Sequence, residues 1–454
     1  MLGIRTASVG WGVLVSAALI VGSAPCSSAQ EIAPVGQYRE GIPIGLWKVF
    51  PSIFAGALYD TNPSQLTSNN EPNSGVSARV VPNLLGVYNT GKVITTLYGT
   101  ADARFFDTNT VAATAGFTNY YQPTPDWVLS TQGNYTRQTD VFNSALNFNN
   151  GAIGPSTTAG SSAPLFINPF GTTPGVNPIA YNQFTGSEAI TKKFGYDNRG
   201  FVTLSGTVYY IAFDHQDNLP ANDFLSTSHD GYNYYLSGRV GYHVVPAVYV
   251  FAESDGILQR FNNSLFNTNG YRVVGGVGSD DPRSLLTGEI YGGYQTQSQV
   301  SQVNPDVINL GVPAGVNSGI PQNVDSSVFG GRIYYFPTRR WSLVAQVDET
   351  LGVSTLLQPT VPAGTPTRTL TSLLQTNYAI SYVLSVGARL GYTRSTFFGI
   401  DRLDNGYLAG ASLNYEVWRN LMLTLDYQYS TVRSDAPLSD FTRNVYTVGL
   451  TYKY

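Results

Sequence analysis

The sequence predicts an all-β protein: a single closed antiparallel transmembrane β-barrel. Three observations predict it. Runs that alternate apolar and polar residues recur from Trp47 to the C-terminus, charged residues are only 12% of the chain, and the connections between runs are alternately short and long. An average soluble protein is about 25% charged. No stretch reaches the roughly eighteen apolar residues of a membrane helix, and lipid then accepts only a closed barrel, which pairs all of its backbone polar groups.

The N-terminus has the pattern of a secretory signal peptide. Arg5 precedes a short apolar segment at 9–21, and small residues up to Ala29 precede a cleavage point. We therefore expect residues 1–29 to be removed during Sec export to the outer membrane of a Gram-negative bacterium. Cleavage would also remove Cys26, the one cysteine of the chain, and so exclude disulfide and thiol chemistry from the mature protein.

The mature chain divides into a periplasmic leader at 30–46 and a barrel at 47–454. The clearest strand pattern is "LMLTLDYQYS", where Leu421 and every second residue after it are apolar or aromatic, whereas the residues between are mostly polar. About eighteen such runs are predicted, with weak alternation in the sixth and tenth, so sixteen strands stays open as an alternative. The runs are 47–60, 74–89, 92–107, 110–122, 126–140, 180–194, 198–215, 228–244, 247–262, 269–279, 284–298, 325–337, 340–355, 368–382, 384–398, 405–418, 420–434 and 441–454.

The connections differ according to the run that they follow. After even-numbered runs they are tight, as in "NTGK", "VVPA" and "WRN"; after odd-numbered runs they tend to be longer, up to the segment 141–179, with a short exception near 108–109. Short turns at one end and long loops at the other are typical of outer-membrane barrels, with turns in the periplasm and loops outside the cell. An even strand count places both ends of the barrel in the periplasm.

Large aromatic residues stand at the tight-turn ends of the runs. They predict an aromatic girdle at the periplasmic interface of the membrane, because Trp and Tyr combine an apolar body with a polar tip. The final strand, which alternates apolar residues and ends on an aromatic, also resembles the signal that the barrel-assembly machinery recognises. The predicted girdle residues are Trp47, Trp127, Trp341, Trp418 and Tyr454.

Charged residues fall mostly on the face opposite the apolar side chains. We expect them to line the lumen and to set solute selectivity. Under the alternative, opposed charges pair and hold the wall together. Because both signs are present, we expect weak ion selectivity. The predicted lumen-lining residues are Arg79, Asp102, Arg104, Arg239, Glu253, Glu289, Arg332, Asp348, Arg389, Glu416 and Asp426.

The segment 141–179 is rich in Gly, Pro, Ser and Thr, which predicts a long extracellular loop. Its apolar stretch "PLFINPF" is large for a water-exposed surface. We expect this stretch to fold into the lumen and narrow it; an external flap or a contact with a neighbouring protomer remains the alternative. The residues of the predicted constriction are Leu165, Phe166, Ile167 and Phe170.

Motifs for catalysis and cofactor binding are missing from the sequence, and we expect no enzyme activity, cofactor or metal. Of the three histidines, His215 and His229 flank one loop among several Asp residues, which leaves a rim metal site open against ordinary solvated side chains; His243 stands apart. The net charge of −4 indicates no nucleic-acid partner.

Several stretches in order, among them "VFPSIFAGALYDTNP", "GYNYYLSGRVGYHVVPAVYVFAE", "IYYFPTRRWSLVAQVDET" and "NGYLAGASLNYEVWRNLMLTLDYQYS", resemble the outer-membrane β-barrel porins of proteobacteria. Some members of that family lie beside exopolysaccharide genes. The resemblance spans most of the mature chain and implies a barrel among outer-membrane lipids and lipopolysaccharide, without catalytic residues.

The expected function is passive passage of small hydrophilic solutes. A role in exopolysaccharide export and a structural or surface-binding barrel without transport remain the alternatives. The sequence leaves the oligomeric state open.

Overall fold

The structure is a computed structural model that describes most of the 454-residue chain. The described residues are 41–63, 74–106, 110–139, 180–214, 230–262, 267–281, 284–300, 323–353, 365–435 and 440–454. The predicted signal peptide, most of the predicted leader and the segment 141–179 lie outside them. So do the predicted constriction residues Leu165, Phe166, Ile167 and Phe170, and the rim histidines His215 and His229.

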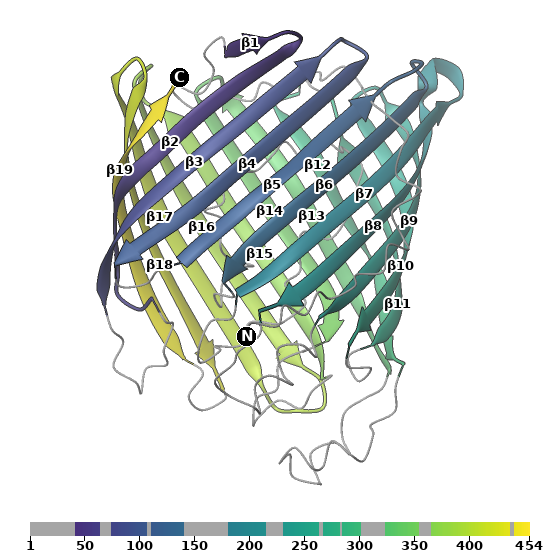
Figure 1. Ribbon diagram of the computed structural model, residues 1–454. Coiled ribbons are helices and arrows are strands. Elements are labelled where there is room, and N and C mark those ends of the chain that lie inside the picture. Colours follow the sequence, from purple (N-terminus) through teal and green to yellow (C-terminus); the bar gives the residue numbers. More distant parts are fainter. Residues whose placement is uncertain are drawn as a thin grey trace, which may run out of the picture.

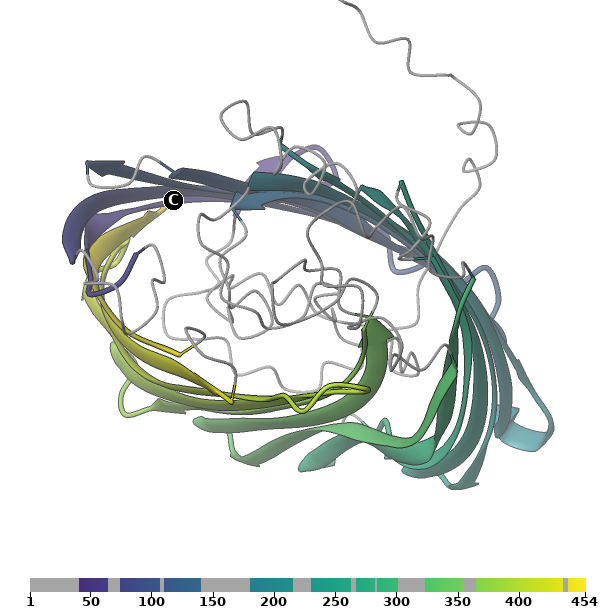
Figure 2. The same cartoon turned by 90° about the horizontal axis from the view of Figure 1, so that it is seen from below.

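Eighteen antiparallel strands form one closed ring, in which each strand pairs with its neighbours in sequence and β19 pairs with β2 (Figures 1 and 2). The prediction of a closed barrel with eighteen strands is confirmed, and the alternative of sixteen is wrong. The ring strands are β2 (Trp47–Asp60), β3 (Gly75–Asn89), β4 (Val93–Phe106), β5 (Thr110–Tyr121), β6 (Trp127–Thr139), β7 (Ala180–Phe194), β8 (Gly200–Phe213), β9 (Gly231–Val245), β10 (Val248–Phe261), β11 (Thr268–Ser279), β12 (Leu286–Gln299), β13 (Asn323–Thr338), β14 (Trp341–Val353), β15 (Pro366–Ala379), β16 (Leu384–Phe397), β17 (Leu403–Trp418), β18 (Leu421–Ser434) and β19 (Phe441–Lys453).

A further short strand, β1 (Ile42–Ile44), folds back on the start of β2 and lies within the segment that the sequence predicted as a leader. Gly45, with φ of +62°, makes the tight reversal between them, a conformation that glycine adopts without strain. A single 3₁₀ turn, η1 (Tyr196–Asn198), is the only helical element in the described ranges. No helix within those ranges is long and apolar enough to cross a membrane.

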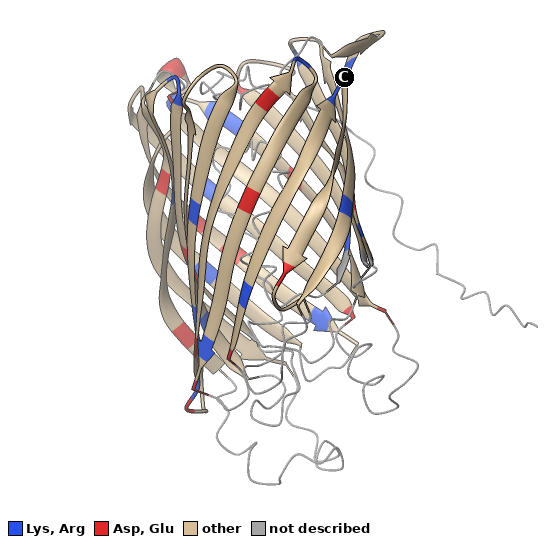
Figure 3. Cartoon of the chain, turned by 90° about the vertical axis from the view of Figure 1, so that its left-hand side faces the viewer, with Lys and Arg blue, Asp and Glu red and all other residues tan. Residues whose placement is uncertain are grey.

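The two faces of the wall differ as the alternation predicts. Along β10, Glu253 and Asp255 are buried on the inner face, whereas Val250 and Leu258 are 42% and 45% exposed on the outer face. The same alternation places Leu236 (71% exposed) and Leu204 (62% exposed) outside. An apolar surface of this extent matches the lipid-facing band of a membrane barrel, and Figure 3 shows long stretches of wall without a charged residue.

The two ends of the barrel also differ. Two-residue turns at 246–247, 339–340 and 419–420 lie at one end, together with β1 and the C-terminus (top in Figure 1). The connections at the other end include the longest ones, and this is the arrangement of periplasmic turns and extracellular loops that the sequence predicted.

The predicted girdle residues all lie at the turn end. Three of them begin a strand, Trp418 ends β17 and Tyr454 ends the chain. The side chains of Trp418 and Tyr454 are 71% and 63% exposed. The indole N–H of Trp341 donates a hydrogen bond of 2.8 Å to Thr376 Oγ1. Their role at the membrane interface stays a prediction.

Candidate functional site

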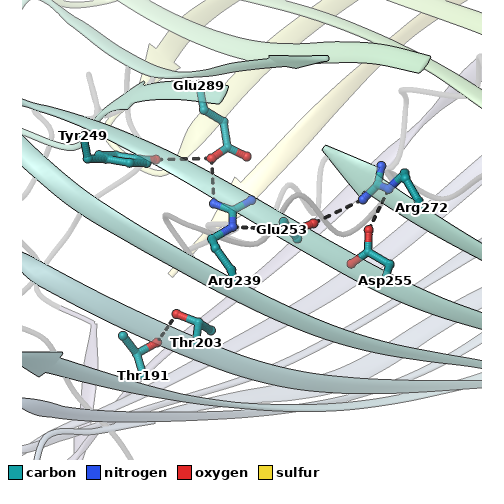
Figure 4. A network of polar contacts seen from close by, with 8 residues as sticks. All are labelled: Thr191, Thr203, Arg239, Tyr249, Glu253, Asp255, Arg272 and Glu289. Carbon is teal, nitrogen blue, oxygen red and sulfur yellow. Dashed lines mark hydrogen bonds and ion pairs between the residues drawn. The ribbon is translucent and has the colours of Figure 1, made fainter. Parts of the chain in front are cut away.

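The inner wall at β9–β12 carries a continuous chain of ion pairs, which we call the corner network: Arg239, Glu253, Asp255, Arg272 and Glu289 (Figure 4). Arg239 on β9 bonds through Nε to the Glu253 carboxylate on β10 and through Nη1 to Glu289 on β12, at 2.9 Å. Arg272 on β11 bonds to Asp255 at 2.7 Å and to Glu253 at 3.3 Å. Alternating charges thus join four consecutive strands.

The centre of the corner network is withdrawn from water. The side chains of Arg239, Glu253 and Arg272 are only 1–2% exposed. A buried charge is tolerated when it is paired and hydrogen-bonded, and it becomes strongly destabilising when its partner is removed. The stability of this part of the wall therefore depends on keeping each charge of the corner network with its partner.

Aromatic rings lie between the arginines and the backbone of the next strand. The Arg239 guanidinium carbon stands 4.1 Å from the centroid of the Phe251 ring. The same ring lies against Gly276 of β11, where an added Cβ would be 2.6 Å from a ring atom. Tyr291 covers Gly330 of β13 in the same way. Glycine is required on these inner positions because the ring occupies the space of a side chain.

Several inner side chains bond across an intervening strand. The Tyr249 hydroxyl on β10 donates to Glu289 on β12 at 3.2 Å, and the Tyr291 hydroxyl on β12 donates to Asp348 on β14. The Gln295 amide of β12 likewise donates to the carbonyl of Leu351 on β14, at 3.1 Å. Such contacts require a strongly curved wall, and Figure 2 shows the ring flattened, with a sharp bend at the teal and green strands.

A second charged group, the β3–β4 triad, consists of Arg79, Asp102 and Arg104. Arg79 makes two hydrogen bonds of 2.9 Å to Asp102, whereas Arg104 reaches the same carboxylate only at 3.4 Å. The two arginines stand directly opposite in the β3–β4 ladder, where like charges repel, so Asp102 holds both. Their side chains are 16% and 29% exposed, which leaves this group accessible to water.

The ring is closed by an ion pair between its first and last strands. Arg443 of β19 bonds through Nε to both carboxylate oxygens of Asp60 on β2, at 3.0 Å. Near this seam Arg389 on β16 bonds to Asp426 on β18 at 2.8 and 2.9 Å. These contacts again run along the wall between neighbouring or next-neighbouring strands.

The structure thus brings eight of the predicted lumen-lining residues into three groups: Arg79 with Asp102 and Arg104, Arg239 with Glu253 and Glu289, and Arg389 with Asp426. The other three differ. Arg332 bonds to the Gln346 amide at 2.9 Å, Asp348 accepts from Tyr291, and Glu416 is half-buried near the turn end of β17. Whether these residues govern solute selectivity stays a prediction.

The sequence analysis did not single out several ionic residues of the inner wall, among them Asp60, Asp255, Arg272, Asp404 and Arg443. Asp255 follows Glu253 by two residues, so the strand period alone could have identified it. Arg272 lies in the tenth run, where glycines at 270, 275, 276 and 278 obscure the alternation. Asp60 and Arg443 stand at strand ends, where the boundaries of a run are least certain.

The described ranges contain no group of three or more His, Cys, Asp or Glu side chains that could hold a metal ion. His243 lies near the turn end, where its Nε2 is 3.3 Å from the Asp280 carboxylate. The contacts of the inner wall are ion pairs and hydrogen bonds that hold strands, and they present polar groups to the lumen.

The sequence matches the family described as "Putative beta-barrel porin 2" over residues 38–307 and 338–454. No curated protein matches it. Solved structures with a similar overall trace include OpdO of Pseudomonas aeruginosa (10% identity, 89% of this chain and 97% of that one, TM-score 0.41). They also include a BenF-like porin of Pseudomonas fluorescens (10%, 89% and 99%, TM-score 0.40) and the siderophore receptor PirA of P. aeruginosa (10%, 89% and 80%, TM-score 0.39).

The family match covers well over half of the residues and agrees with the closed ring of strands. The chain therefore belongs to the beta-barrel porin family of that description and is a porin-like outer-membrane barrel.

Proposed function

We propose that this barrel lets small hydrophilic solutes diffuse passively across the outer membrane. One observation carries the proposal: a closed ring of eighteen strands with an apolar outer face and a polar, charged inner face. Barrels of about sixteen to eighteen strands are wide enough to leave an aqueous channel. A polar inner face is the lining that such a channel needs.

The arrangement of the inner charges supports the same function. Each ion pair joins strands that are at most three positions apart in the ring, as from Arg239 on β9 to Glu289 on β12. Among the described inner residues, no ion pair crosses from one side of the lumen to the other. Since the groups carry both signs, we expect weak ion selectivity.

The proposal includes the path of the protein to the membrane. Residues 1–29 would direct Sec export, 30–46 would remain in the periplasm, and the C-terminal strand would be recognised by the barrel-assembly machinery. The barrel at 47–454 would then stand among lipids and lipopolysaccharide, with 141–179 as an extracellular loop that narrows the lumen.

Polysaccharide export is the less favoured function. Sugars in a conduit stack on open aromatic faces, as other ligands with flat apolar faces do. The inner rings of Phe201, Tyr249 and Phe251 are each less than a tenth exposed. In this cluster the rings pack against glycine and arginine, so they offer little open surface to a sugar.

The test is the conductance of the purified, folded barrel in a planar lipid bilayer. Stepwise, ohmic conductance is expected. A cysteine at Thr114, on the inner face of β5, should make the channel sensitive to a bulky thiol reagent. The matched control is Ala115→Cys, which points outward. A folded barrel that stays silent at high protein load would reject the open channel.

A further inference from the structure

Glu188 lies in the middle of β7 on the outer face of the barrel. It is separated by an even number of residues from Phe184 and Ile190, and therefore lies on the same face of the strand. Phe184 and Ile190 are 50% and 46% exposed, and Glu188 is itself exposed. The residues on the other face of β7, such as Thr185 and Ser187, are polar and point into the barrel, as expected for a lumen lining. A carboxylate therefore stands where every neighbouring barrel position of this strand faces lipid.

The depth of Glu188 places it well inside the apolar band. It is six residues from Phe194, the last residue of β7. Phe194 lies at the turn end of the barrel, close to the level of Trp127. At about 3.3 Å per residue and a strand tilt near 40°, this is roughly 15 Å along the membrane normal. The apolar band of an outer-membrane barrel is about 25 Å tall, so Glu188 lies near its middle.

Other charged residues on the outer face are placed differently. Lys192 lies close to the turn end and pairs with Asp126. Arg137 and Glu349 lie toward the opposite end, where Arg137 pairs with Asp214 and Glu349 stands 3.8 Å from Arg368. Within the part of the chain that the structure describes, Glu188 takes part in no ion pair and its carboxylate in no hydrogen bond. A charge at this depth is costly in lipid unless another group covers it.

The surface around Glu188 has two outward positions without a side chain and carries its own hydrogen-bond donor. Thr131 on β6 stands directly opposite Glu188 in the ladder, on the same outer face. Gly206 on β8 is its partner on the other side, and Gly186 is the next outward residue of β7. A Cβ added at Gly186 would meet nothing within 4 Å. We call Glu188, Thr131, Gly186 and Gly206 the lipid-facing patch.

We propose that the lipid-facing patch is the contact between two copies of this chain, related by a two-fold axis along the membrane normal. In such an interface, if one residue of the first copy contacts a second residue of the other copy, the reverse contact is also made. A hydrogen-bond acceptor and a donor that lie side by side on one copy can therefore form two equivalent hydrogen bonds with the other copy. Glu188 of each copy accepts a hydrogen bond from Thr131 of the other, and the glycines let the two walls approach closely.

The surroundings provide enough surface for such a contact. The patch is bordered by exposed apolar side chains of β7, β8 and β9, namely Phe184, Ile190, Leu204, Val208 and Leu236. Four strands at about 4.8 Å spacing over a band of about 25 Å cover roughly 480 Å² per copy. Two copies together would bury about 1,000 Å², near the lower size of a specific interface.

Disulfide crosslinking in intact membranes tests the proposal in a Cys26→Ser background. Ile190→Cys, at the next outward position of β7, leaves Glu188 and Thr131 in place and should crosslink into a species of twice the monomer mass. Leu390→Cys on β16 is the matched control, since it is also exposed on the outer face but lies nine strands away around the ring. Equal crosslinking at the two positions, or a product that contains a different protein, would overturn the proposal.

Equilibrium association in lipid nanodiscs supplies the second measurement. Thr131→Val should weaken dimerisation by about tenfold or more, and Glu188→Leu should do the same, because each removes two symmetric charge-assisted hydrogen bonds. Glu188→Gln keeps an acceptor and should have a smaller effect. If the wild-type protein is monomeric at high protein-to-lipid ratio, or if Glu188→Leu leaves the association unchanged, the two-fold contact does not exist.

Discussion

The corner network on β9–β12 and the β3–β4 triad are made of the same residue types in different surroundings. In the corner network Arg239 and Glu253 are 1–2% exposed, and rings and carboxylates enclose the guanidinium. In the triad Arg104 is 29% exposed and has one contact of 3.4 Å. Both groups lie on the inner face, so the alternation of side chains along a strand does not distinguish them.

This difference in exposure indicates that charged residues of the inner face have one of two roles. Where the wall bends sharply, inner side chains crowd together, exclude water and need every partner. Where they remain in contact with water, charges keep donors available and act on the lumen through their field. The corner network should therefore determine stability, whereas the triad should affect permeation.

The largest effect is expected from Arg239→Leu. The substitution leaves Glu253 and Glu289 without their shared cation in a buried site, and should lower the free energy of unfolding by about 3–5 kcal/mol. Urea unfolding of the barrel in lipid vesicles, followed by tryptophan fluorescence, measures it. Arg389→Leu is the control, since its pair with Asp426 is 12–14% exposed. Equal losses in the two variants would remove the distinction between the regions.

Packing around the corner network is probed by Gly276→Ala. The added methyl group would stand 2.4 Å from the carbonyl oxygen of Ile290 and 2.6 Å from the Phe251 ring. We expect a loss of about 1–3 kcal/mol in the free energy of unfolding. Gly99→Ala on β4, with nothing within 4 Å, should be neutral or stabilising by about 0.5 kcal/mol. A larger loss of unfolding free energy in Gly99→Ala than in Gly276→Ala would contradict the close packing of the Phe251 ring against Gly276.

The triad is tested by Arg104→Gln. Stability should change by no more than about 0.5 kcal/mol, because the side chain is partly exposed and weakly bonded. The reversal potential across a salt gradient should shift toward cations, since one positive charge leaves the lumen. Arg394→Gln, on the outer face of β16, is the control. A shift of equal size in that variant would argue against a specific effect of Arg104.

The smallest effect concerns Asp126, in the turn before β6. Hydrogen bonds from Lys192 and Thr124 lower the pKa of its carboxyl to about 2. Since the folded-state pKa is depressed, the stabilisation is present at neutral pH and is lost as the pH falls from about 4 through 2. Asp126→Asn should therefore unfold slightly more easily than wild type at pH 7, and this difference should shrink as the pH falls toward 2. A difference of the same size at pH 7 and at pH 2 would exclude titration of Asp126 as its cause.

The two weakest runs of the sequence were weak for structural reasons. In 180–194 the alternation is broken by Gly186 and Glu188 on the outer face, the two positions at the centre of the lipid-facing patch. In 269–279 it is broken by inner glycines such as Gly276 and Gly278, over which the rings of Phe251 and Tyr249 lie. Both departures mark places where a neighbouring group, in this chain or in another copy, takes the space of a side chain.

The sequence by itself determined the approximate bounds of most strands and the face on which their side chains lie, because these follow from a period of two residues along one strand. It indicated about eighteen strands, and the structure decided between eighteen and sixteen. The sequence also indicated which end carries the tight turns. The partners of the inner charges were decided by the tertiary structure. Glu289 meets Arg239 three strands away, and Asp60 meets Arg443 near the other end of the chain. Such contacts depend on the tilt, register and curvature of all eighteen strands together, and no local pattern contains them.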